Sequence, residues 1–155
     1  MPGLGYEVAD IVEGIWRSVF DVEVVPEDPA GLAGQRVRTG AGIVHISGAW
    51  AGSVAIQGAE PLVNRWTTAL LGITENRPAP EQQGRALGEL ARMIGEALTP
   101  VLPQPCGLSI PEAAWGEDVR LHLPDAVPVL RSAFRAVDQV FAVTIFQRLP
   151  AGTPG

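Results

Sequence analysis

The chain has 155 residues, of which 46% are apolar and 18% charged, a composition typical of a globular protein and a length that fits one domain. Its formal net charge of −6 argues against nucleic acid and against an anionic membrane surface as partners, because both attract basic proteins. All eleven basic residues are Arg, so the chain holds no Schiff-base or P-loop lysine.

The sequence carries no signal for export or for a membrane span. Its single thiol, Cys106, cannot form an internal disulfide, and residues 1–7 lack the basic and apolar regions of a signal peptide. No apolar run approaches the roughly 20 residues that a spanning helix needs. We therefore expect a cytoplasmic protein with no membrane partner.

The elements are predicted in chain order from the spacing of apolar residues and from Pro and Gly. In the first half we expect a helix at 6–20, a short strand at 22–25 and a loop at 27–35. A β-hairpin of 37–46 with 50–57, a second helix at 61–72 and a second loop at 77–80 are expected to follow. Pro26 is expected to close the short strand. Three tryptophans fall on apolar faces and are predicted to lie in the core: Trp16, Trp50 and Trp66.

In the second half we expect a long helix at 81–101 and a short strand at 108–110. Two further strand candidates at 127–136 and 140–148 and a frayed tail at 151–155 are expected to follow. Segment 127–136 also has apolar residues at helical spacing, whereas segment 140–148 is rich in β-branched and aromatic residues. The order predicts an α+β fold with a mixed, largely antiparallel sheet and helices packed on one face. No linker divides residues 1–150, so one domain is expected there.

The long helix has two different faces. At roughly 100° per residue, its apolar residues converge on a core face and its polar residues on the opposite side. The polar stripe consists of Gln82, Arg85, Glu89, Arg92 and Glu96. Taken alone, it is a ladder of ion pairs three and four residues apart, which stabilises an exposed helix by a few tenths of a kcal/mol per pair.

The surroundings of this stripe resemble a known family. Residues 86–95, with the sequence ALGELARMIG, are similar to the signature of the CheC/CheX/FliY chemotaxis phosphatases, in which a Glu is followed three residues later by an Asn. The turn at 46–54, the helix at 60–72 and the segment LSIP at 108–111 resemble the CheX branch in order and spacing. The resemblance extends from the first helix to about Leu149.

The resemblance implies removal of the phosphoryl group from the aspartate of a CheY-like response regulator. Glu89 matches the residue that docks the regulator, and Arg92 stands where the Asn amide would orient the attacking water. A guanidinium has five donors and no acceptor, so it cannot accept a hydrogen bond from that water. Gln82 carries the one amide on this face of the helix, almost three turns before Arg92. The first helix offers no second copy, because Trp16 follows Glu13 by three residues.

The resulting hypothesis is a CheX-like signalling domain that binds a receiver domain, or itself, without the usual phosphatase turnover. Glu89 and Arg92 are the predicted reactive residues, and Gln82, Arg85 and Glu96 the predicted binding residues. Two alternatives stay open: an active phospho-aspartate phosphatase that uses another residue, and a structural dimerisation subunit. The resemblance also implies a homodimer.

No cofactor is expected, and no metal is assigned. The residue types that could form a metal site are His45, Cys106 and His122. No two of them have the close spacing of a ligand pair.

Overall fold

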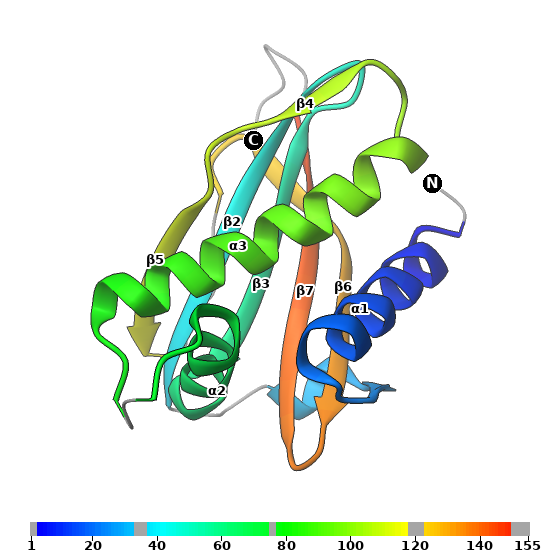
Figure 1. Cartoon of the computed structure of the whole chain (residues 1–155). Helices are drawn as coiled ribbons and strands as arrows, with labels where there is room; N and C mark the ends of the chain where they lie inside the picture. The colour runs from blue at the N-terminus through cyan, green and yellow to red at the C-terminus, as the bar shows by residue number, and fades with distance from the viewer. Residues whose placement is uncertain (1–2, 33–36, 75–76, 118–122, 150–155) are drawn as a thin grey trace.

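A computed structural model describes residues 3–32, 37–74, 77–117 and 123–149 of the chain. Figure 1 shows three helices on one face of a twisted sheet. The helices are α1 (Leu4–Phe20), α2 (Glu60–Leu71) and α3 (Pro80–Leu98), with short 3-10 turns at η1 (Pro29–Leu32) and η2 (Thr99–Val101). The expected tail at 151–155 lies outside the described residues.

The sheet contains seven strands in the described part of the chain. They are β1 (Val24–Glu27), β2 (Arg38–Gly48), β3 (Gly52–Ala59), β4 (Cys106–Leu108), β5 (Glu112–Glu117), β6 (Ala126–Ala136) and β7 (Gln139–Arg148). The order is β1-β6-β7-β3-β2, and both β4 and β5 pair with β2. Every pairing is antiparallel. The predicted α+β fold, with helices on one face, is confirmed.

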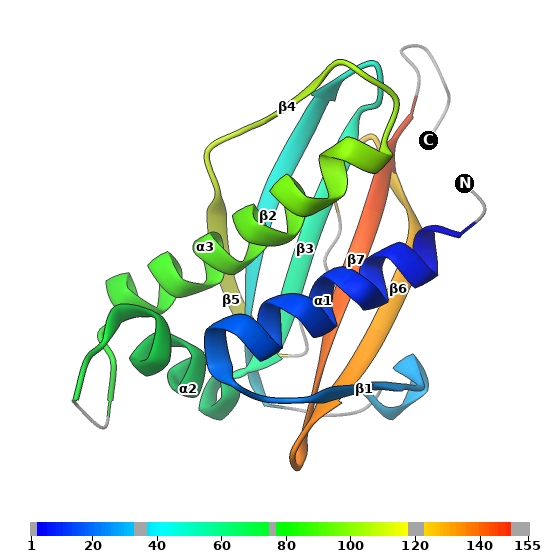
Figure 2. The same ribbon diagram turned by 45° about the vertical axis from the view of Figure 1, so that its right-hand side comes forward.

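The helices lie close to the sheet because apolar stripes on both meet in one core. Figure 2 shows α1 and α3 side by side across the strands, with α2 at one end of the sheet. The core face of α3 is fully buried at Leu87, Leu90, Ile94 and Leu98. Small residues permit the close approach: a Cβ on Gly42 of β2 would lie 2.5 Å from the carbonyl carbon of Leu87. The backbones of β2 and α3 are therefore almost in contact.

An aromatic cluster joins α1, α2 and the β6–β7 hairpin. The Trp16 ring stacks on Phe141 with a centroid distance of 4.7 Å and an interplanar angle of 11°. Trp66 meets both of these rings edge-on, at 5.6 Å and 5.3 Å. The three tryptophans predicted to be core residues are all buried, which confirms that prediction.

Three predictions near the sheet edges were wrong or incomplete. The first strand lies two residues later than expected and contains Pro26, which an edge strand accepts because one side of its backbone needs no donor. The strand expected at 108–110 ends at Leu108 and begins at Cys106. Strand β5 was not predicted at all. Its small residues carry no alternating pattern, and it forms because it pairs with Gly40 and Gly42 of β2.

Segment 127–136, which fitted a strand or a helix, is a strand. β6 pairs with β7 along its length, and the two are joined by a two-residue turn at Val137 and Asp138. The long helix was predicted to reach residue 101, but it ends at Leu98. Residues 99–101 form the 3-10 turn η2 instead. The expected loop at 27–35 contains the end of β1 and all of η1, and its residues 33–35 lie outside the described residues.

Candidate functional site

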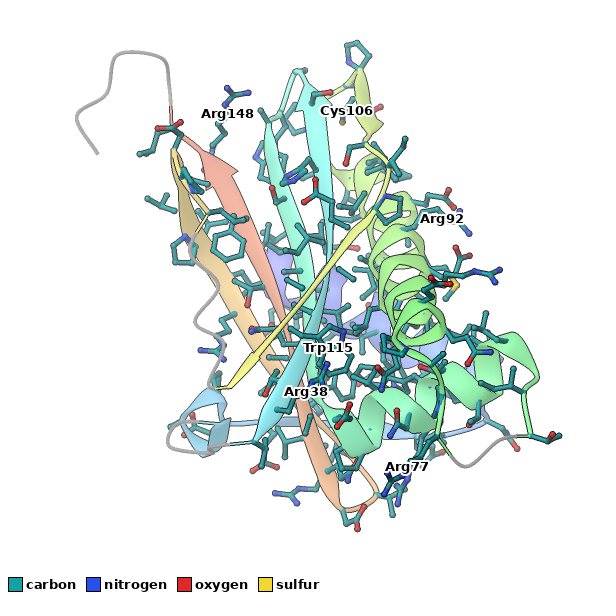
Figure 3. The ribbon with its side chains drawn as sticks, turned by 90° about the vertical axis from the view of Figure 1, so that its left-hand side faces the viewer. Arg38, Arg77, Arg92, Cys106, Trp115 and Arg148 are labelled. Carbon is teal, nitrogen blue, oxygen red and sulfur yellow. The ribbon has the colours of Figure 1, made fainter. Side chains whose placement is uncertain are left out.

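The predicted polar stripe lies on the side of α3 that faces away from the sheet. Figure 3 shows Arg92 projecting from this side of the helix. The stripe residues are partly or fully exposed, while the core-face residues between them, such as Leu87, Leu90 and Ile94, are buried. The helical period that predicted two faces is therefore confirmed, and the stripe is open to a partner molecule.

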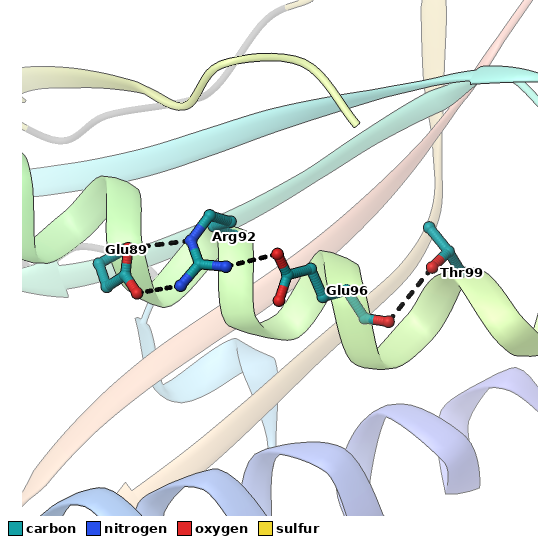
Figure 4. Close-up of polar contacts among 4 residues, drawn as sticks. All are labelled: Glu89, Arg92, Glu96 and Thr99. Atoms are coloured by element: carbon teal, nitrogen blue, oxygen red, sulfur yellow. Dashed lines mark hydrogen bonds and ion pairs between the residues drawn. The ribbon is translucent and has the colours of Figure 1, made fainter. Parts of the chain in front are cut away.

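Arg92 is held by two carboxylates of its own helix (Figure 4). Its Nε donates to Glu89 Oε2 at 3.0 Å, and its Nη2 donates to Glu89 Oε1, which makes a two-pronged ion pair. Its Nη1 donates to Glu96 Oε1. The side chains of Arg92, Glu89 and Glu96 are 37%, 42% and 55% exposed. We call these three residues the Arg92 clamp.

The clamp fixes the charges of its members. The hydrogen bond from Arg92, aided by its positive charge, lowers the pKa of Glu89, while partial burial acts in the opposite direction. Hydrogen bonds to Glu89 and then to Glu96 raise the pKa of Arg92 above its ordinary value. At neutral pH Glu89 is therefore a carboxylate beside the Arg92 guanidinium, and Arg92 cannot act as a proton acceptor.

The other two stripe residues have different surroundings. Gln82 lies in the first turn of α3, where its Oε1 accepts the backbone N–H of Ala79 at 2.7 Å. This amide oxygen therefore caps the helix. Arg85 is exposed and makes no ion pair with any described residue, although its spacing to Glu89 allowed one. Glu89 pairs with Arg92 instead, so the guanidinium of Arg85, one helical turn before Glu89, is available to a partner.

Two residues on or near α3 were missed by the sequence analysis. Gln83 is buried at the start of α3, and its Nε2 donates to Asn64 Oδ1 at 2.7 Å and to Glu60 Oε2 at 3.2 Å. These bonds tie the start of α3 to α2. Ile110 is 86% exposed, and the adjacent Pro111 lies against Gly88 of α3. The sequence analysis placed Ile110 at the end of a strand before Pro111, so it did not predict that this side chain is exposed.

The residues considered for a metal are engaged otherwise. His45 Nδ1 lies 2.6 Å from Ser53 Oγ, and its Nε2 lies 3.8 Å from Glu112 Oε2. Cys106 Sγ donates to the carbonyl of Pro103 at 3.1 Å. His122 lies outside the described residues. Among the described residues, no three His, Cys, Asp or Glu side chains form a group that could hold a metal ion.

Two further structural findings concern α1 and the membrane. Trp16, which follows Glu13 where a second copy of the motif would need an amide, is 1% exposed and lies in the core. Helix α1 therefore presents no second stripe of the α3 type. None of the described helices is long and apolar enough to cross a membrane.

Comparison with known proteins gives one family and a set of similar folds. Residues 41–135 match the family model of the chemotaxis phosphatase CheX. The fold is similar to chemotaxis protein CheX from Vibrio vulnificus, with a TM-score of 0.74 and 17% identity over 92% of this chain and 95% of that one. No curated protein matches the sequence.

Two more solved structures have a similar fold. One is the CheX–CheY–BeF3–Mg2+ complex from Borrelia burgdorferi, with a TM-score of 0.71 and 16% identity over 92% of this chain and 97% of that one. The other is FliY from Thermotoga maritima, with a TM-score of 0.58 and 10% identity over 97% of this chain and 91% of that one. At these identities, the resemblance concerns the fold.

Proposed function

Because the chain belongs to the chemotaxis phosphatase CheX family, we propose that it binds the receiver domain of a CheY-like response regulator through the stripe on α3, without the usual phosphatase turnover. The observation that carries this proposal is the Arg92 clamp. The family resemblance assigns docking to the Glu89 position and water orientation to position 92. In this chain position 92 is occupied by an Arg, and its side chain is held by Glu89.

The chemistry of position 92 argues against turnover. Hydrolysis in line with the phosphorus needs a water held in a near-attack position, and an amide holds it by accepting one of its hydrogen bonds. A guanidinium has no acceptor. The guanidinium is also held along the helix, because two of its N–H groups donate to the Glu89 carboxylate.

The same clamp suits recognition of a phosphoryl group. Three of the donors of Arg92 are engaged by Glu89 and Glu96, and the guanidinium is more than one-third exposed. Arg binds phosphate well because its planar donors match the phosphate oxygens. Arg92, together with Arg85, which makes no ion pair with any described residue, could therefore contact a phosphorylated receiver without activating water.

We include Ile110 in the proposed docking surface. Its side chain is almost fully exposed, yet its backbone is well held: Ser109 N–H donates to His45 O at 2.9 Å, and Ser109 Oγ donates to Ile110 O at 3.1 Å. When a partner covers an apolar side chain on a backbone that is already held, only the side chain has to be ordered, which reduces the entropy cost of binding. Ile110→Ser is expected to weaken receiver binding and to leave the fold intact.

The first experiment measures phosphate release from a phosphorylated receiver domain and, separately, capture of the receiver with and without beryllofluoride. We expect no acceleration of phosphate release, with binding favoured by beryllofluoride and weakened by Glu89→Ala. Glu7→Ala, an exposed Glu on α1, is the control and should bind like the wild type. Robust turnover that Glu89→Ala abolishes would overturn the non-catalytic proposal and favour the phosphatase alternative. No receiver binding at all would favour a structural subunit.

The second experiment restores the amide. Arg92→Asn releases Glu89 and supplies an acceptor for water, so we expect measurable phosphate release. Arg92→Ala is the matched control, because it also releases Glu89 but has no amide, and it should stay inactive. Equal activity of the two variants would refute the role given to the amide, and no gain in either would mean that the docking surface has diverged as well.

A homodimer through the free edge of β6 is also proposed. Within the described residues, β1 pairs only with residues 133–136 of β6, so residues 126–132 have no second strand beside them. Val127 and Val129 are exposed along this stretch. An open strand edge is a template for pairing with another chain. Light scattering is expected to give a dimer, and Val129→Lys a monomer, whereas Val101→Lys, an exposed Val in η2, should change nothing; a monomeric wild type would refute the proposal.

A further inference from the structure

The face of the sheet opposite the helices carries a pocket. Along β2 and β3, Val44 and Val54 lie in the main core beneath the helices, so the adjacent His45 and Ser53 point to the opposite face. The pocket lies where β2 and β7 end and β3 and β6 begin, and its volume is about 260 Å³. Side chains that line it include His45, Ser47, Ser53, Asp125 and Arg148. An engineered cavity of about 150 Å³ holds benzene, so this pocket has room for a small ligand.

Two opposite charges line this pocket from neighbouring strand ends. Arg148 is the last residue of β7, from whose end its side chain extends (Figure 3), and Asp125 directly precedes β6. The two segments are hydrogen-bonded: Ala126 is the register partner of Arg148, and Leu149 N–H donates to Asp125 O at 2.7 Å. Opposite charges so placed attract each other. Neither side chain makes an ion pair with any described residue, so a cation and an anion are both available in one pocket.

The backbone that carries these charges is held in place. Arg148 N–H donates to Ala51 O at 2.9 Å, and Asp125 has a φ of 61°, a conformation that Asp adopts more readily than most residues. The polar groups on the other side of the pocket bond each other, because His45 Nδ1 lies 2.6 Å from Ser53 Oγ. The groups that remain for a charged ligand are therefore the Arg148 guanidinium and the Asp125 carboxylate.

We propose that this pocket binds a small zwitterion, an amino acid with a short side chain. The ligand carboxylate accepts hydrogen bonds from Arg148, whose planar, paired donors match a carboxylate. The ligand ammonium group donates to the Asp125 carboxylate. The volume of the pocket limits the side chain of the ligand to a few atoms. Because α3 lies on the other face of the sheet, this site is separate from the polar stripe and does not depend on receiver binding.

The test compares L-alanine with two derivatives that each lack one charge, with affinities from protein NMR shifts. N-acetyl-L-alanine has no ammonium group, and L-alaninamide has no carboxylate. Each derivative loses one charge-assisted contact, so we expect it to bind about tenfold more weakly than alanine. Failure of alanine to bind the wild type at millimolar concentration would overturn the proposal, and so would equal affinities for the three probes.

Two variants test which side chain holds which charge. Arg148→Gln should weaken alanine about tenfold and leave alaninamide unchanged, whereas Asp125→Asn should weaken alanine about tenfold and leave N-acetylalanine unchanged. Both positions are exposed, and Asn tolerates the positive φ at 125, so both variants should fold. The controls are Arg131→Gln and Asp21→Asn, at exposed positions outside the pocket, and Asp21 also has a positive φ of 53°. They should change no affinity. A pocket variant that binds alanine like the wild type, or that weakens all three probes equally, would overturn the proposal.

Discussion

Gly42 offers a direct test of how the stripe-bearing helix is positioned. A Cβ at this position would meet the carbonyl carbon of Leu87 at 2.5 Å and the amide nitrogen of Gly88 at 3.2 Å, with the carbonyl oxygen of Leu87 closer still. These are backbone atoms, so no side-chain rotation relieves the clash. Normal contacts begin at about 3.5 Å, and therefore β2 and α3 would have to separate by about 1 Å.

The expected loss is large because α3 buries four apolar side chains against this part of the sheet. A radial gap of about 1 Å forfeits up to roughly half of the dispersion energy of each contact, and overpacking in cores costs about 1–3 kcal/mol or more. Gly42 does not have positive φ, so its backbone conformation adds no penalty. We expect Gly42→Ala to lower the free energy of unfolding by at least about 3 kcal/mol.

Gly14 provides the matched control for Gly42. It lies inside α1, it is exposed, and a Cβ there would have nothing within 4 Å. Gly14→Ala should raise the free energy of unfolding by about 0.5–1 kcal/mol, because Ala is favoured over Gly inside a helix. Urea denaturation followed by circular dichroism measures both variants. If Gly42→Ala stays within about 1 kcal/mol of the wild type, the close approach of α3 and β2 is refuted.

Three further predictions concern the core, the clamp and the β6–β7 turn. Phe141→Ala removes a fully buried ring from the aromatic cluster and should cost about 3–5 kcal/mol in urea denaturation, and a loss below about 1 kcal/mol would contradict the packing described. Glu89→Gln should lower stability by a few tenths of a kcal/mol at pH 7, since the pair is half-exposed. Because folding lowers the pKa of Glu89, this difference should hold above about pH 4.3, the ordinary Glu value, and vanish as the pH falls through the lower folded-state pKa; a difference that persists at pH 2 would refute the pairing. Val137→Asn should raise the thermal midpoint by relieving the positive φ, whereas Val129→Asn, in a strand without positive φ, should lower it; the opposite order would refute strain at Val137.

Elements with a strong local period were predictable from the sequence. The two faces of α3 follow from spacing alone, because the helix buries one regular set of apolar residues. The hairpin of β2 and β3 follows from two strand-like segments and the turn between them, although β3 is buried on both of its faces. Strand β5 was not predictable, since its small residues gain their order from pairing with the glycines of β2. The sequence also did not determine whether Glu89 pairs with Arg92 or with Arg85, because both spacings are allowed on a helix.

The polar stripe and the aromatic cluster also differ in how far the sequence predicted them. The stripe comes from one helix, so its members could be named before the structure was known. The aromatic cluster draws on α1, α2 and the β6–β7 hairpin, and its central member, Trp16, has the sequence pattern of an ordinary core residue. Only the packing of three distant segments brings Trp16, Trp66 and Phe141 together. Local periodicity carries no information of this kind.

The composition of the stripe also bears on the speed of binding. Arg85 and Arg92 balance Glu89 and Glu96, so the surface that faces a partner is electrically neutral in a chain whose net charge is −6. A neutral surface gives no long-range steering, and encounters then proceed at about 10⁵–10⁶ M⁻¹s⁻¹. A receiver that docks here should associate at a rate that added salt scarcely changes. Selection among receivers would then depend on how long each complex survives rather than on how often it forms.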